Sequence, residues 1–185
     1  MNLPNKLTMF RAILIPVIIW LMYSNNANYI LASIAVFLIA IYTDRLDGQI
    51  ARKRNLKSIF GTFFDPLVDK MLILSIFFAF SDLKIIPLWI VLIVLCREFL
   101  VTGIRQVCSK PTKVVGANWM GKSKFLMQSA VIIYTLFFMY FNLAGSIVFF
   151  NQTLVFWINL IVALISLGYA GNFLYWHRKE ILKGI

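Results

Sequence analysis

Four aspartates with regular spacing are the residues of this sequence best suited to do chemistry. Asp44 and Asp47 are three positions apart, Asp65 and Asp69 are four apart, and the two pairs fall within a window of 26 residues. At about 100° per residue on a helix, the members of each pair lie on one face. They are four of only seven acidic residues in the chain. The spacing therefore predicts two helices that each present a pair of carboxylates.

Four carboxylates close together in an apolar chain need positive charge beside them. Two divalent cations would balance them, and ligation by oxygen alone is what Mg²⁺ prefers. Two such ions can clamp a phosphoryl group while it is transferred. Small residues beside the aspartates would let a nucleotide lie against the helix backbone, and Arg52 adds charge for its phosphates. The simpler alternative is a set of interhelical salt bridges, which would explain one or two of the aspartates but not four.

The composition indicates that a membrane protein carries these residues. Of the 185 residues, 61% are hydrophobic, whereas soluble chains are roughly 45–50% apolar. Only 14% are charged, and these divide into 18 Lys or Arg and seven Asp or Glu, for a net charge of +11. A nucleic-acid-binding protein with that charge would expose far more polar surface. An apolar chain with surplus basic residues is instead typical of a membrane protein oriented by its positive loops.

Six apolar segments predict an all-α fold. We expect each of them to extend through charged neighbours into one membrane-crossing helix. They cover residues 12–23, 29–42, 71–80, 85–96, 125–141 and 154–176. Every second connection is poor in Lys and Arg, and the basic clusters lie on the other side. This asymmetry predicts one domain over residues 1–185 with six transmembrane helices, and with both termini and the aspartates on the cytoplasmic side of the cell membrane.

The string D-x₂-D-G-x₂-A-R-x₈-G-x₃-D-x₃-D, which runs from Asp44 to Asp69, resembles the signature of the CDP-alcohol phosphotransferase family. The fixed positions and fixed gaps make this pattern very specific. The resemblance implies a six-helix membrane enzyme that moves a phosphatidyl-type group from a CDP-linked donor to an alcohol and releases CMP. It also implies a homodimer and no nucleic-acid partner.

The resemblance further implies roles for single residues. Two metal ions, Mg²⁺ or Mn²⁺, would be bound by Asp44, Asp47, Asp65 and Asp69, and the last of these would also take the proton of the acceptor alcohol. The residues that would shape or contact the CDP group are Gly48, Ala51, Arg52 and Gly61.

A second stretch, N-x-L-T-x-x-R, narrows the resemblance to one branch of the family. Asn5, Thr8 and Arg11 supply its fixed polar positions. The stretch resembles the start of the first helix in the enzymes whose donor is CDP-diacylglycerol and whose acceptor is glycerol 3-phosphate, where it lies beside the nucleotide phosphates. A branch that uses phosphatidylglycerol and makes cardiolipin shares the motif and is the nearest alternative. From another class, a divalent-cation transporter would place its aspartates near the bilayer midplane instead.

Several cations outside the motif are candidates for binding the acceptor. Arg105, Lys122 and Lys124 lie on the aspartates' side of the membrane, and we expect them to hold the acceptor's phosphate. A generic positive loop is the alternative. Arg97 lies deeper, in the fourth apolar segment, where pairing with an acid on another helix would be its structural role. We expect it not to face Glu98, because sequence neighbours diverge by about 100° on a helix.

Overall fold

The described part of the chain folds into six α-helices. The computed structural model describes residues 3–53, 59–108, 119–145 and 151–182, and these contain no strand. The helices are α1 (Leu3–Met22), α2 (Ala27–Lys53), α3 (Ile59–Asp82), α4 (Leu88–Cys108), α5 (Trp119–Leu143) and α6 (Gln152–Leu182). This confirms the prediction of an all-α fold.

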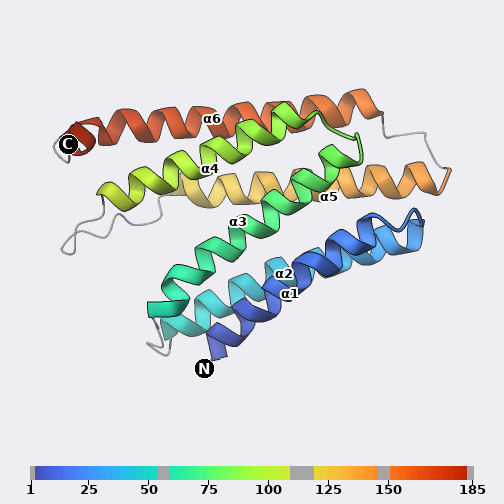
Figure 1. Cartoon of the computed structure of the whole chain (residues 1–185), viewed down its shortest axis with the longest axis horizontal. Coiled ribbons are helices and arrows are strands. Elements are labelled where there is room, and N and C mark those ends of the chain that lie inside the picture. The colour runs from blue at the N-terminus through green and yellow to red at the C-terminus, as the bar shows by residue number, and fades with distance from the viewer. Residues whose placement is uncertain (1–2, 54–58, 109–118, 146–150, 183–185) are drawn as a thin grey trace.

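Consecutive helices run in opposite directions along the bundle (Figure 1). The connections from α1 to α2 and from α3 to α4 lie at one end of it, together with the end of α5 and the start of α6. The start of α1 and the end of α6 both lie toward the other end, together with the first turns of α3 and the last turns of α2 (Figure 1). The helix ends that carry the predicted aspartates are therefore on the same side of the bundle as the ends of the chain.

Short polar residues set the helix boundaries in the connections. Asn26 caps α2, since its Oδ1 accepts a hydrogen bond from the backbone N–H of Asn28 at 2.9 Å. Asn151 caps α6 in the same way, through the N–H of Thr153 at 3.1 Å. At the turn after α3, Lys84 adopts a left-handed backbone conformation with φ 58°. These turns reverse the chain within a few residues and keep the helices antiparallel.

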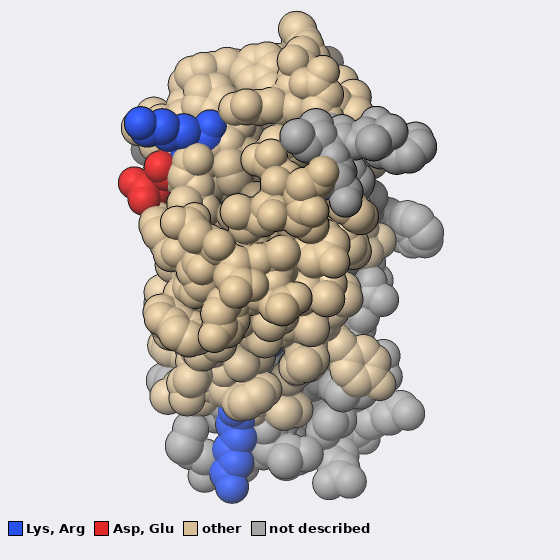
Figure 2. All heavy atoms as spheres, turned by 90° about the vertical axis from the view of Figure 1, so that its right-hand side faces the viewer, with Lys and Arg blue, Asp and Glu red and all other residues tan. Residues whose placement is uncertain are grey.

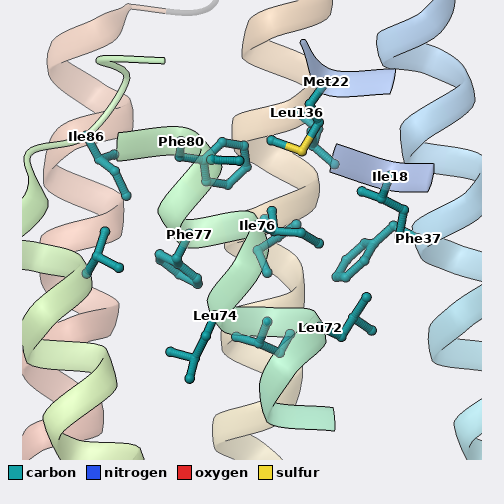
Figure 3. Packing of buried hydrophobic residues seen from close by; sticks show 14 of the residues in the cluster. Ile18, Met22, Phe37, Leu72, Leu74, Ile76, Phe77, Phe80, Ile86 and Leu136 are labelled. Carbon is teal, nitrogen blue, oxygen red and sulfur yellow. The ribbon is translucent and has the colours of Figure 1, made fainter. Parts of the chain in front are cut away.

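The helices pack as two groups of three joined through the middle of the bundle. In the first group α1 lies against both α2 and α3; in the second α6 lies against both α4 and α5. The two groups are joined by α2, which packs against α5, and by α3, which contacts α4 and α5. Apolar side chains of α3 fill the centre of the core (Figure 3). The residues gathered there include Ile18, Phe37, Leu72, Ile76, Phe77, Phe80 and Leu136.

The outer surface of the bundle is apolar rather than polar. Large side chains such as Ile13, Trp20, Phe99 and Trp176 are each more than 60% exposed, which is unusual for a soluble monomer. Figure 2 shows that, on the face toward the right of Figure 1, the described atoms belong almost entirely to uncharged residues. These are features of a membrane protein.

Three stretches among the described residues are long and apolar enough to cross a bilayer. They are Ala27–Asp44 in α2, Lys124–Leu143 in α5 and Gln152–Trp176 in α6. The prediction of a membrane protein with six helices is supported to this extent. Crossing by all six helices stays a prediction.

Candidate active site

α1 lies between the two helices that carry the aspartates. Asp44 is on α2, Asp65 and Asp69 are one turn apart on α3, and α1 packs against both helices. Thr8 and Arg11 are three residues apart on α1, so they share one face of it. Both are almost fully buried, at 1% and 0% exposure. This buried polar face of α1 lies where the helix packs against α2 and α3.

Arg11 joins the aspartates of the two helices. Its Nη1 donates a hydrogen bond to Oδ1 of Asp44 at 2.5 Å and another to Oδ1 of Asp69. The guanidinium is inaccessible, whereas the side chains of the two aspartates are 27% and 32% exposed. Two carboxylates that lie far apart in the sequence thus share one buried cation, while part of each carboxylate stays accessible to solvent.

Thr8 adds the third described aspartate to this arrangement. Its hydroxyl donates a hydrogen bond to Oδ1 of Asp65. Because Asp65 precedes Asp69 by one helical turn, α1 binds two successive turns of α3 through two successive polar residues of its own. The group formed by Thr8, Arg11, Asp44, Asp65 and Asp69 is called the aspartate cluster below.

The charges of the aspartate cluster leave room for a metal ion. The interhelical salt bridge considered as an alternative does exist, and it involves two of the aspartates. The single positive charge of Arg11, however, balances only one of the two carboxylates that it contacts. Negative charge with ligands that are all oxygen suits a hard divalent cation such as Mg²⁺. The side chains present therefore fit the predicted metal.

The metal centre itself stays a prediction. Within the described part of the chain, no group of three or more His, Cys, Asp or Glu side chains gathers closely enough to hold one ion. Asp47, the fourth predicted ligand, belongs to α2, but its side chain lies outside the described residues. The other predicted site residues whose side chains lie outside the described part of the chain are Asn5, Gly48, Ala51, Arg52, Gly61, Arg105 and Lys122.

Lys124, which was expected to bind the acceptor's phosphate, is the one residue of that set whose side chain is described. Its Nζ forms an ion pair with Oε1 of Glu98 on α4. The side chain of Lys124 is 13% exposed and that of Glu98 is 7% exposed. Sequence reasoning gave Glu98 no role. A signal was present, because a lone acid in an apolar helix needs a cation from a neighbouring helix.

The expectation that Arg97 would not face Glu98 is wrong. Nη1 of Arg97 lies 3.2 Å from Oε1 of Glu98. The backbone directions of the two residues do diverge, but a guanidinium on a long side chain can curl around the helix to meet its neighbour. The other expectation for Arg97, pairing with an acid on another helix, stays a prediction. Across the bundle, Arg97 donates a hydrogen bond from Nε to the backbone carbonyl of Ser166 on α6, at 3.0 Å.

Comparison with known proteins gives consistent results. The sequence profile of the CDP-alcohol phosphatidyltransferase family matches residues 1–165. A CDP-diacylglycerol–glycerol-3-phosphate 3-phosphatidyltransferase of Bacillus subtilis (strain 168) is 37% identical over 151 residues, which cover 73% of this chain and 78% of that protein.

Two proteins of the same name in other bacteria are also similar. The one from Rickettsia typhi is 41% identical over 130 residues, covering 69% of this chain and 71% of that protein. The one from Mycoplasma genitalium is 30% identical over 174 residues, covering 85% and 73%. The similarity therefore extends well beyond the aspartate motif.

Proposed function

The chain belongs to the CDP-alcohol phosphatidyltransferase family, and from this premise we propose that it transfers the phosphatidyl group of CDP-diacylglycerol to sn-glycerol 3-phosphate. The products would be phosphatidylglycerophosphate and CMP. The proposal rests mainly on one observation: Arg11 donates hydrogen bonds to a carboxylate of α2 and to a carboxylate of α3. It occurs in a chain 37% identical to a protein named for this reaction.

We place the enzyme in the cell membrane as a single domain over residues 1–185, with all six helices crossing. Both termini and the aspartate cluster would face the cytoplasm. Support comes from the position of the two chain ends on the aspartates' side of the bundle (Figure 1) and from the sparse charge of the opposite face (Figure 2). The enzyme would work as a homodimer. The donor's acyl chains would lie in the lipid beside the apolar outer surfaces of the helices.

The aspartates would hold two divalent cations, Mg²⁺ or Mn²⁺. Asp44, Asp47, Asp65 and Asp69 are the proposed ligands, and the oxygen donors described at three of them suit these metals. When bound, such cations neutralise the donor's diphosphate and stabilise the charge that develops on the transferred phosphoryl group. The negative charge that Arg11 leaves unbalanced is what would attract them.

The chain's own residues would bind the nucleotide on the same side. Arg11 would act on the nucleotide through the aspartates, because its guanidinium is fully buried and fixes the carboxylates of Asp44 and Asp69 by hydrogen bonds. Thr8 fixes the neighbouring carboxylate of Asp65, which keeps that side chain from rotating. The remaining proposed contacts to the CDP group are Asn5, Gly48, Ala51, Arg52 and Gly61.

Asp69 would be the base that activates the acceptor. It would take the proton of the glycerol hydroxyl as that oxygen forms a bond to the β-phosphorus of the donor. The bond from this phosphorus to the bridging oxygen breaks, and CMP leaves with the bridging oxygen. The acceptor's own phosphate would be held away from the aspartates by Arg105, Lys122 and Lys124, because like charges near the metal-bound diphosphate would repel it.

Release of CMP from CDP-diacylglycerol by the purified protein tests this function. The reaction should require both glycerol 3-phosphate and a divalent cation, and Asp69→Asn should abolish it. Asp82→Asn is the matched control, since Asp82 lies at the other end of the same helix and contacts Tyr23. This control should retain full activity.

Other outcomes of the same assay would redirect the proposal. CMP release with phosphatidylglycerol, but not with glycerol 3-phosphate, would indicate a cardiolipin synthase. Metal flux into liposomes without CMP release would indicate a transporter. Equal loss of activity in the two aspartate variants would remove the special role of Asp69.

A further inference from the structure

A second ionic group is buried in the other half of the bundle. It consists of Arg97 and Glu98 on α4 and of Lys124 and Gln128 on α5, and it is called the Glu98 cluster below. Arg97 and Glu98 are each 5% exposed and Gln128 is 1% exposed. Charged side chains held this deep in a membrane protein are costly and therefore indicate a function.

One oxygen of Glu98 organises the whole cluster. Oε1 accepts from Nζ of Lys124, from Nη1 of Arg97 at 3.2 Å and from Nε2 of Gln128 at 3.4 Å. Arg97 is anchored in turn to α6 through the carbonyl of Ser166. The carboxylate thus fixes the Lys124 ammonium between α4 and α5, with α6 as a support.

The balance of charge in the cluster favours an anion. Among the four side chains of the cluster, two cations surround one carboxylate in a region poorly screened by water. Without Glu98 the two buried cations would repel each other as well as lose their hydration. Glu98 therefore stabilises the charged form of Lys124. Because it supplies only one negative charge for two cations, it does not prevent the cations from attracting a phosphate.

The helices of the Glu98 cluster, α4 and α5, both contact α3, which carries Asp65 and Asp69. α3 and α5 pack together in the bundle. The ammonium that Glu98 fixes is thus beside the helix that carries the proposed base.

We propose that Glu98 is a positioning residue for the acceptor: it holds the Lys124 ammonium, charged and oriented, where the phosphate of glycerol 3-phosphate binds. The inference rests on the proposed function, in which Lys124 contacts that phosphate. Glu98 touches neither substrate, and its effect is exerted through Lys124. The donor site belongs to the other half of the molecule and does not depend on it.

Steady-state kinetics with each substrate varied in turn test the positioning role. In Glu98→Gln the carboxylate is lost at nearly constant volume. The KM for glycerol 3-phosphate should rise about tenfold to a hundredfold, the range expected for loss of a charge-assisted contact. The KM for CDP-diacylglycerol should change less than twofold. A merely structural role would change both values alike or alter only the thermal unfolding temperature.

A reversed ion pair keeps the test decisive if Glu98→Gln does not fold. Glu98→Lys combined with Lys124→Glu restores a pair between α4 and α5 but moves the cation to the wrong helix. The double variant should recover thermal stability relative to either single variant, yet keep the raised KM for glycerol 3-phosphate. Recovery of that KM together with stability would show that the pair is structural and would overturn the proposal.

Two further measurements complete the test. In a Lys124→Met background, Glu98→Gln should add little to the KM for glycerol 3-phosphate, because Glu98 acts through Lys124. Independent, multiplying effects would contradict this. Asn159→Leu is the control for simple destabilisation, since Asn159 is buried on α6 in a separate hydrogen bond with Thr135. It should lower the unfolding temperature and leave both KM values unchanged.

The wild-type protein separates this inference from the proposed function. If it releases CMP with glycerol 3-phosphate and Glu98→Gln shows no selective rise in the acceptor's KM, the positioning role alone is overturned. If the wild type is inactive with glycerol 3-phosphate, the proposed function fails first and this inference fails with it.

Discussion

The two halves of the molecule contain ionic clusters of opposite composition. In the α1–α3 half, one buried guanidinium is shared by two carboxylates, and a threonine binds a third. In the α4–α6 half, one buried carboxylate is shared by two cations and an amide. Each central charge is outnumbered by its partners. Counted over these side chains alone, the first cluster has more carboxylates than cations, which suits metal ions, and the second has more cations than carboxylates, which suits a phosphate.

The clusters also differ in how open they are. Asp44 and Asp69 keep about a quarter to a third of their side-chain surface exposed, whereas Glu98 keeps 7%. An accessible carboxylate can exchange protons and ligands, but an enclosed one can only hold its neighbours in place. The aspartate cluster is therefore suited to binding metal and transferring protons, whereas the Glu98 cluster is suited to holding Lys124 in place.

The largest effect is expected for Arg11→Met. Removing the central cation leaves two adjacent carboxylates unbalanced, which should cost about 3 kcal/mol of stability. CMP release should fall by at least about a hundredfold. Thermal unfolding in detergent and the CMP assay measure the two effects. Lys6→Met is the matched control, because Lys6 is an exposed cation on the same helix. Equal behaviour of the two variants would show that Arg11 is not central.

Arg97→Met should reduce stability less than Arg11→Met does. Glu98 would still be bound by Lys124 and Gln128, so its charge would remain balanced. We expect a loss of about 1–3 kcal/mol, from one charged contact and the hydrogen bond to Ser166. Thermal unfolding measured beside Arg11→Met checks the order. A larger loss for Arg97→Met would mean that the second cluster, not the first, depends on a single cation.

Thr8→Val tests the hydrogen bond between Thr8 and Asp65 in the aspartate cluster. The variant keeps the shape of the side chain but removes the hydrogen bond to Asp65. The expected loss is about 1 kcal/mol of stability, with a several-fold fall in CMP release. Thr8→Ser keeps the hydroxyl and should retain most of the activity. If Val and Ser behave alike, the hydrogen bond has no role in holding Asp65.

The smallest effect is expected at the opposite end of the bundle, for Tyr23→Phe. The hydroxyl of Tyr23 donates to Asp82 at 2.6 Å, and this hydrogen bond raises the pKa of Tyr23. Because folding raises this pKa, the contribution is present below about pH 10 and is lost as the pH rises through the folded-state value. The substitution should lower the unfolding temperature slightly at pH 8, and this difference should shrink as the pH rises above about 10. A shift that grows at high pH would contradict the assignment.

The helices could be predicted from the sequence, but their ends could not. α1 begins at Leu3, nine residues before the apolar segment that indicated it, and α2 continues to Lys53 beyond residue 42. Hydrophobicity changes where the lipid ends, whereas backbone hydrogen bonds continue into polar residues. α4 starts three residues later than its apolar segment. The left-handed turn at Lys84 and Pro87 delay its start.

The site could be predicted only in part. The spacing of the aspartates indicated which helices carry them, and α2 and α3 do. That Arg11 would bridge Asp44 and Asp69 depends on how α1 packs, which residue spacing along one helix does not determine. The available signal was that Arg11 lies three residues after Thr8, which places the two side chains on one face of α1. The contact between Arg97 and Glu98 was predicted wrongly, because backbone direction was taken for the reach of a long, flexible side chain.

Binding of Mn²⁺, followed by electron paramagnetic resonance, tests most directly whether the aspartate cluster is a metal centre. Purified wild-type protein with CDP-diacylglycerol should bind two Mn²⁺ per chain, and Mg²⁺ should compete for the same sites. Asp44→Asn and Asp69→Asn should each lose this binding, while Asp82→Asn and Glu98→Gln should keep it. Undiminished binding in Asp44→Asn and Asp69→Asn would contradict the assignment of the metal to this cluster.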